Sequence, residues 1–252
     1  MGEVPSLERA IAILRLFSRA RRLIAAPEIV QELGIPRSTA HRLLQSLVEL
    51  DLLRREPGDF YATGHGILTL GFEHLASQPL TDVASPVLAR LRDRTGCTAH
   101  LAVLDKRNTI YILRHLTPSP FTPTIGIGAS VPAHATVMGR VLLLDTDPAA
   151  VRRLYRGVTL QKFTDRTPRT VDEFLGLLAV DRARGYAVSE GFFGNVAAIA
   201  APVRNSIGDI VAGISLVAAR GSDGAARMSE ATIADVLAAA AEISKILGMQ
   251  NR

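Results

Sequence analysis

The sequence predicts an α+β protein of two domains, on three observations. With 252 residues the chain exceeds the size of one small domain, and 48% of its residues are apolar, which allows two hydrophobic cores. Residues 1–62 show three stretches of helical periodicity followed by one hairpin pattern. Residues 80–252 instead mix helices with hairpin-linked strands, which is typical of an α+β domain around an antiparallel sheet.

The first domain begins with three helices joined by short connections. Ser6 is a candidate N-cap for the first helix, and a short second helix runs from Pro27 to Leu33. Gly34 ends that helix in a left-handed conformation, and Pro36 starts the third helix almost immediately. The first helix is marked by apolar residues at helical spacing, namely Leu7, Ala10, Ile11, Leu14 and Phe17.

The third helix has a buried face and an exposed face. Its apolar stripe consists of Ala40, Leu43, Leu44, Leu47 and Val48. The polar residues that share the opposite face, because spacings of three, four and seven residues return to nearly the same angle, are Ser38, His41, Arg42 and Gln45. Residues 52–55 and 60–61 flank the turn at Pro57–Asp59 and predict a two-stranded hairpin. Three helices and a hairpin make a winged helix–turn–helix.

The polar stripe suits the reading of DNA bases. Arginine binds guanine through two hydrogen bonds, and glutamine binds adenine in the same way. An ordinary solvated helix face is rich in Glu and Lys, whereas this one has no acid before Glu49 and directly follows the turn at Gly34. The residues predicted to bind DNA are Arg37, Ser38, Thr39, His41, Arg42 and Gln45 on the helix, with Arg54 and Arg55 on the wing.

A connecting helix and a larger domain complete the chain. Residues 63–66 interrupt the pattern, and the apolar residues that follow predict a helix that ends at Pro79. We therefore expect a DNA-binding domain at 1–64, a linker helix at 65–79 and a larger domain at 80–252. In the larger domain the predicted helices lie at 83–91, 134–144, 149–155, 171–183 and 229–247, and the predicted strands at 98–104, 109–115, 124–127, 186–188, 197–203 and 210–217.

Composition limits the cellular compartment and the kinds of partner that the chain is expected to have. The single cysteine, Cys97, excludes an internal disulfide and fits a small core residue. The net charge of +5 would suit a nucleic-acid partner, but residues 1–62 carry nine Arg and eight Asp or Glu, so the helix pattern has to support DNA contact. Apolar runs are too short to span a bilayer, and charged residues interrupt any signal-peptide pattern near the start. We expect a cytoplasmic protein without membrane contact.

Several motifs, in order along the chain, resemble the IclR family of bacterial transcriptional regulators. The matching segments are Leu7–Ala10, Gly34–Thr39, His41–Leu44, Pro132–Thr136, Gly139–Arg140, Gly185–Ala187 and Ile199–Val203. The resemblance implies an effector domain related to the GAF fold, and dimers that pair through the N-terminal domains and the linker helix and often form a dimer of dimers on a partly palindromic operator. The apolar linker residues assigned to pairing are Ile67, Leu70 and Phe72.

The resemblance also implies where a small molecule binds, between the sheet and the segment after the Pro-x-His motif. Carried over residue by residue, the effector-binding positions are Val131, Val137, Met138, Ser189, Glu190, Val196, Ala198, Ser215 and Val217. The implied ligand is a small organic acid, with an aromatic acid favoured and the two serines as donors. A plain hydrophobic core would show the same apolar residues. Departures from the family pattern are Ala198, the short stretch 189–195, and Asp51 in place of a glycine, although Asp tolerates a left-handed turn.

Two other classes of function find less support. An enzyme would need a nucleophile elbow or a dinucleotide loop, but Ser130 and Ser189 lack the elbow and Gly126-x-Gly128 lacks a third glycine. The six histidines lack metal-ligand spacing, and His134 is expected to make a hydrogen bond at a helix start. A nucleoid protein would need a broad basic surface. The sequence therefore predicts a sequence-specific repressor, without cofactor or metal, whose operator affinity an effector controls.

Overall fold

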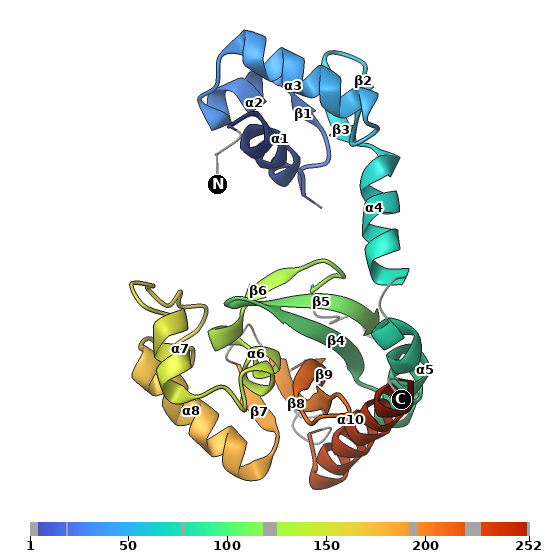
Figure 1. Cartoon of the computed structure of the whole chain (residues 1–252), viewed down its shortest axis with the longest axis vertical. Coiled ribbons are helices and arrows are strands. Elements are labelled where there is room, and N and C mark those ends of the chain that lie inside the picture. The colour runs from blue at the N-terminus through green and yellow to red at the C-terminus, as the bar shows by residue number, and fades with distance from the viewer. Residues whose placement is uncertain are drawn as a thin grey trace. The chain divides into compact units, whose positions relative to one another are not determined.

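The computed structural model describes residues 5–18, 20–76, 79–117, 125–191, 196–219 and 228–250. The chain divides into two compact units, Met1–Ser77 and Gln78–Arg252 (Figure 1). Each unit has a hydrophobic core of its own, and together they confirm the predicted α+β class. The helix expected as a separate linker, α4 (His65–Ala76), groups with the first unit.

The first unit is a winged helix–turn–helix. Its other elements are α1 (Pro5–Leu16), β1 (Ile24–Ala25), α2 (Ala26–Leu33), α3 (Arg37–Glu49), β2 (Leu53–Glu56) and β3 (Phe60–Thr63), and its described strands form an antiparallel sheet in the order β1-β3-β2. The third helix and the hairpin are confirmed. The two-residue strand β1 was not predicted, because two residues carry no alternation. Ser6 lies inside the first turn of α1, so the prediction that it caps the helix was wrong.

The core of this unit draws one large aliphatic side chain from each main element. Ile13 of α1, Ile29 of α2 and Leu44 of α3 are fully buried, together with Leu53 of β2. Burial of each such side chain stabilises the fold by about 1.5–3 kcal/mol. The polar face of α3 is therefore held outward by the packing of its opposite face.

Two residues in the left-handed conformation fix the position of α3. Gly34 (φ +60°) ends α2 and lets α3 begin three residues later. Asp51 (φ +54°) reverses the chain after α3, and its carbonyl oxygen accepts a hydrogen bond from the Gly66 backbone N–H at 2.9 Å. The left-handed turn expected at Asp51 is confirmed.

The second unit is built on one antiparallel sheet whose described strands have the order β6-β5-β4-β9-β8-β7. The strands are β4 (Thr98–Asp105), β5 (Asn108–His115), β6 (Ser130–Pro132), β7 (Ala187–Glu190), β8 (Val196–Arg204) and β9 (Ile210–Ala219). The helices are α5 (Pro79–Thr95), the short 3-10 helix η1 (Ala133–Ala135), α6 (Val137–Leu142), α7 (Pro148–Leu154), α8 (Val171–Arg184) and α10 (Glu230–Gln250). Figure 1 shows α6 on one side of the sheet and α5 with α10 on the other.

Two predictions for this unit were wrong. The strand expected at 124–127 is absent at 125–127, where the chain forms a coil and a turn, and residue 124 lies outside the described residues. The edge strand is instead β6, whose three residues include a proline and so give no strand pattern. The helix expected over 134–144 is interrupted at Thr136, which is extended and caps α6 by accepting a hydrogen bond from the Gly139 N–H at 2.9 Å.

Candidate functional site

The predicted DNA-binding residues of the third helix share one surface of the first unit. Five of the six helix residues are exposed, and Thr39 is half-buried. Pro36 precedes the helix and has no side-chain group that could cap its first N–H groups. Because uncapped N–H groups and the helix dipole both favour anions, this end of α3 suits a DNA phosphate.

The charges on this surface differ between helix and wing. Among the described residues, Arg37 and Arg42 of α3 have no acidic partner, whereas the wing arginines each pair with a neighbouring acid. Arg54 contacts Glu56, and Arg55 contacts Asp59, in both cases at 2.9 Å. The α3 arginines are therefore free to meet phosphates or bases, while the wing arginines must first leave their partners.

A groove between α1 and α3 adds a cation that the sequence reasoning missed. The groove has a volume of about 540 Å³ and is lined by Arg9 and Leu7 of α1 together with Thr39, Arg42 and Ser46 of α3. Arg9 is exposed, and no acid pairs with it among the described residues. Only the packing of α1 beside α3 shows this, because Arg9 lies far from α3 in the sequence.

The predicted effector residues gather on the sheet face that packs against α6, which we call the α6 face. The strand register places Ser189, Ala198, Val217 and Thr98 in one row across β7, β8, β9 and β4. The next row crosses five strands and consists of Ala187, Ala200, Ser215, His100 and Arg114. Since side chains alternate between faces along a strand, both rows project from the same face.

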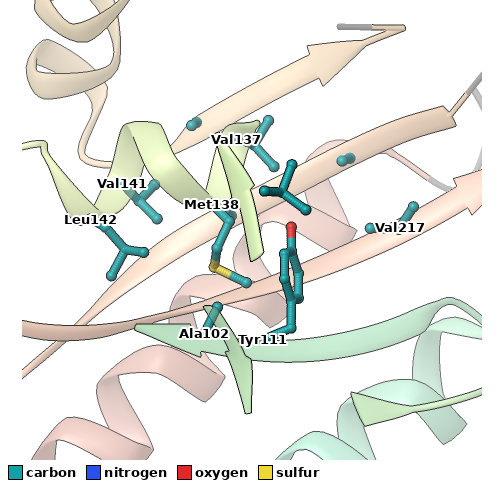
Figure 2. Close-up of a cluster of buried hydrophobic side chains, with 11 residues drawn as sticks. Ala102, Tyr111, Val137, Met138, Val141, Leu142 and Val217 are labelled. Carbon is teal, nitrogen blue, oxygen red and sulfur yellow. The ribbon is translucent and has the colours of Figure 1, made fainter. Parts of the chain in front are cut away.

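Five of the predicted residues lie in one buried cluster, drawn in Figure 2, and Val196 packs against it. The five are Val131, Val137, Met138, Ala198 and Val217. The two serines are also buried, Ser189 on β7 and Ser215 on β9, while Glu190 pairs through its backbone with Ala197. The helix α6 approaches the sheet closely at Gly213, where an added Cβ would lie within 3.0 Å of the Met138 sulfur.

The α6 face contains a buried histidine that the sequence reasoning did not select. His100 is fully buried, and neither ring nitrogen has a hydrogen-bond partner among the described residues. Burial lowers the pKa of His100 to about 4, with the nearby Arg114 cation adding to the effect, so the ring is neutral at pH 7. The sign in the sequence that could have identified His100 was a histidine within an apolar predicted strand. Its neighbours on other strands could not be known without the register.

A buried ion pair holds α6 against α8. The Arg140 guanidinium contacts the Asp181 carboxylate at 2.9 Å, and both side chains are 1% exposed. Arg184 also pairs with Asp181, and Arg140 donates a hydrogen bond to the Val188 carbonyl of β7. Burial raises the pKa of Asp181, against the opposing effect of the two arginines, and lowers the pKa of Arg140 to about 10. Arg140 therefore links the helix over the α6 face to the strand that carries Ser189.

His134 makes a hydrogen bond near a helix start, with a partner distant in the sequence. Its Nε2 lies 2.9 Å from the Gln161 carbonyl oxygen, and its ring packs edge-on against Tyr155 and Phe174. The helix start nearby is capped by Thr136 instead. The expected hydrogen bond near the helix start is therefore present, but its partner is Gln161, so the histidine ties that loop to the start of α6.

Two further features of the described residues bear on the chemistry. No group of three or more His, Cys, Asp or Glu side chains there could hold a metal ion. None of the helices in this part of the chain is long and apolar enough to cross a membrane.

Comparisons with known proteins agree on one family. Residues 72–245 match the family described as "Bacterial transcriptional regulator IclR C-terminal", and residues 6–57 match "IclR helix-turn-helix domain". The chain is 32% identical over 204 residues to the glycerol operon regulatory protein of Streptomyces coelicolor, which covers 80% of each chain. It is 28% identical over 193 residues to the transcriptional repressor IclR of Escherichia coli, covering 75% of this chain and 70% of that one.

A solved structure shows the same fold. The crystal structure of an IclR homologue from Microbacterium hydrocarbonoxydans, complexed with 4-hydroxybenzoate, superposes with a TM-score of 0.83 at 24% identity. The superposition covers 96% of this chain and 98% of that chain.

Proposed function

The chain belongs to the IclR family of bacterial transcriptional regulators, which are not enzymes, and we propose that it is a cytoplasmic repressor whose operator affinity is controlled by a small organic acid. It binds a partly palindromic operator as a dimer, through α3 and the wing. The effector binds on the α6 face and remains chemically unchanged.

The observation that carries the DNA-binding part is the exposed polar face of α3. Packing of Ala40 and Leu44 fixes which face points outward, and the left-handed turn at Gly34 fixes where the helix starts. Arg42 lies in the middle of the exposed stripe and also lines the groove with Arg9. A base-reading role is therefore best supported for Arg42, with phosphate roles for Arg37, Arg9 and the start of the helix.

Replacing Arg42 by alanine is expected to weaken operator binding by about 1–3 kcal/mol, because a bidentate contact to a base contributes about that much discrimination. The measurement is a gel-shift titration at fixed salt with a footprinted operator. The matched control is Arg156→Ala, which removes an exposed cation of the second unit. An Arg42→Ala variant that is folded by circular dichroism and binds the operator as tightly as the wild type would contradict this assignment.

The dimer is proposed because a single winged helix offers a small interface and a palindromic operator needs two of them. The structure leaves Leu70 and Phe72 of α4 65% and 64% exposed, and Ile67 half-buried. Leu68, on the same helix, is 70% exposed and extends the apolar surface available for pairing. We also propose that two such dimers pair to form a dimer of dimers. The oligomeric state is tested by counting the chains bound per operator in the gel-shift titration and by measuring the mass of the complex.

The effector part rests on the α6 face, which combines apolar walls from α6 with buried polar side chains of the sheet. Ligand sites are typically apolar with a few convergent polar groups. Met138 and Val196 supply walls, and Ser189 and Ser215 supply hydroxyls. The homologue of the same fold that was crystallised with 4-hydroxybenzoate supports an aromatic acid as the first probe.

We expect an acid that binds the α6 face to change operator affinity by about 1–3 kcal/mol, the usual range of allosteric coupling. The experiment is calorimetry of the full chain with 4-hydroxybenzoate and other small acids, with and without operator, followed by mass analysis of the recovered acid. Affinity that does not depend on operator would contradict the sensor role, since equal affinity for both states shifts nothing. A chemically altered acid would favour an enzyme instead.

Repression is tested separately, by transcription in vitro from a promoter that overlaps the operator. Added protein should lower the transcript level. A rise in transcript would replace repression by activation and leave the DNA-binding proposal intact.

A further inference from the structure

Both ring nitrogens of His100 lie buried where the described residues supply no hydrogen-bond partner. The residue is on β4, in the middle of the sheet, and is 0% exposed. Its only described ring contact is an edge-on packing against Tyr111 with the ring centroids 5.4 Å apart, which satisfies neither nitrogen. A buried polar group without a hydrogen bond is costly, so the two ring nitrogens call for a partner from outside the chain, an ordered water or a bound molecule.

The side chains beside His100 on β9 and β8 are short. Directly opposite it on β9 is Ser215, and beyond Ser215 on β8 is Ala200. The adjacent row presents Ala198 and Val217. The next row toward α6 contains Gly213, over which Met138 packs. Met138 therefore approaches from the Gly213 row, while the adjacent row toward Ala198 presents no side chain larger than valine.

On its other side His100 faces a cation. Arg114 of β5 is directly opposite His100 in the antiparallel register. Arg114 is half-buried, and its Nη1 donates a hydrogen bond to the Ile125 carbonyl oxygen at 3.0 Å. Within the described parts of the chain no carboxylate pairs with it. A partly buried guanidinium with one carbonyl partner retains several donors for an anion.

We propose that His100 and Arg114 select the effector, and that the effector is a small hydroxy acid whose carboxylate binds Arg114 and whose hydroxyl binds His100. The proposal rests on the effector role of the α6 face given above and adds the residues that determine specificity and the class of acid they accept.

A hydroxyl is favoured because both ring nitrogens are buried without a partner, and a neutral ring needs an acceptor for one and a donor for the other. A neutral imidazole offers one N–H donor and one acceptor nitrogen. A carboxylate can satisfy only the donor, whereas a hydroxyl donates as well as accepts. Ser215 lies directly opposite His100 on β9, so its hydroxyl can bind the same hydroxyl group of the ligand. Residues opposite each other in an antiparallel pair are about 4.5–5.5 Å apart at Cα, so one small molecule can reach both His100 and Arg114.

The test is a cycle that changes the protein and the ligand separately. The probes are the three hydroxybenzoate isomers and lactate. Benzoate and propionate are their analogues without the hydroxyl, and phenol is the analogue of the hydroxybenzoates without the charge. Each is titrated calorimetrically into the full-length chain. The wild type should bind at least one hydroxy acid about tenfold or more tightly than its analogue without the hydroxyl. His100→Leu should remove that preference and leave benzoate affinity nearly unchanged, and Arg114→Gln should remove the preference for benzoate over phenol.

Two controls separate a ligand role from a structural one. His100→Leu removes a buried group without a partner, so its thermal midpoint should equal or exceed that of the wild type. Thr109→Val removes another buried hydroxyl without a described partner, on β5 beyond Tyr111, and should leave all affinities unchanged.

The outcomes distinguish the two levels of the proposal. A wild type that binds none of the acids overturns the effector role of the α6 face and this inference with it. A hydroxy acid that binds the wild type and His100→Leu equally well overturns this inference alone. The same holds if His100→Leu lowers the thermal midpoint and weakens hydroxy acid and benzoate alike, because the histidine would then be structural.

Discussion

Replacing Asp181 by alanine is expected to destabilise the second unit by about 3–5 kcal/mol, because it leaves the guanidinium of Arg140 buried without its carboxylate. Both side chains are 1% exposed, so water cannot replace the lost partner. Arg140 also donates a hydrogen bond to the Val188 carbonyl of β7, so a shift of the unpaired guanidinium would disturb that strand. Hydrogen–deuterium exchange of peptides covering α6 and β7 measures this unit separately from the first one.

Two comparison variants show whether burial causes the effect. Asp172→Ala, on the same helix α8, breaks an ion pair with Arg152 in which both side chains are more than half exposed, and should cost less than about 1 kcal/mol. The double variant Arg140→Met/Asp181→Leu replaces both charges and should recover most of the stability, since well-packed apolar residues often match a buried pair. Equal losses for Asp181→Ala and Asp172→Ala would show that the buried pair contributes no more than a surface one.

Local patterns in the sequence predicted most of the secondary structure. The strands expected at 98–104 and 109–115 differ from β4 and β5 by one residue each, because alternation and the turn between them are local signals. The same holds for α3, where the stripe of apolar residues and the turn at Gly34 lie within a few residues of one another. The failures fall where a tertiary contact overrides the pattern. Thr136 breaks a helical pattern because its hydroxyl caps α6.

The two candidate sites also differ in how far local patterns in the sequence could predict them. The α3 surface could be predicted from spacing alone, because all its helix residues are on one element. The α6 face could not, because its rows combine residues from five strands and a bulge between Leu101 and Ala102 shifts the register with β5. Resemblance to a family indicated several of its apolar residues and both serines. His100 and Arg114 became candidates only once the register brought them opposite each other.

Gly139 occupies the place where α6 comes nearest to the preceding backbone. A Cβ at this position would lie within 3.0 Å of the Ala133 carbonyl oxygen and of two other Ala133 backbone atoms. Backbone atoms of a packed segment cannot move aside as a flexible side chain can. Ala133 is itself fully buried, in a cluster with Tyr155 and Phe174. An added methyl group therefore has to displace η1 or α6.

Replacing Gly139 by alanine is therefore expected to destabilise the second unit by about 3 kcal/mol or more, above the usual cost of overpacking because the clash is with backbone. The acid binding proposed for the α6 face should fall with it, since Val137 and Met138 belong to α6. Gly176→Ala is the matched control: Gly176 is in the exposed interior of α8 with nothing within 4 Å of its added Cβ, and the change should stabilise that helix by about 0.5–1 kcal/mol. Exchange protection across α6 that is the same in Gly139→Ala as in the wild type would show that η1 and α6 can separate without cost.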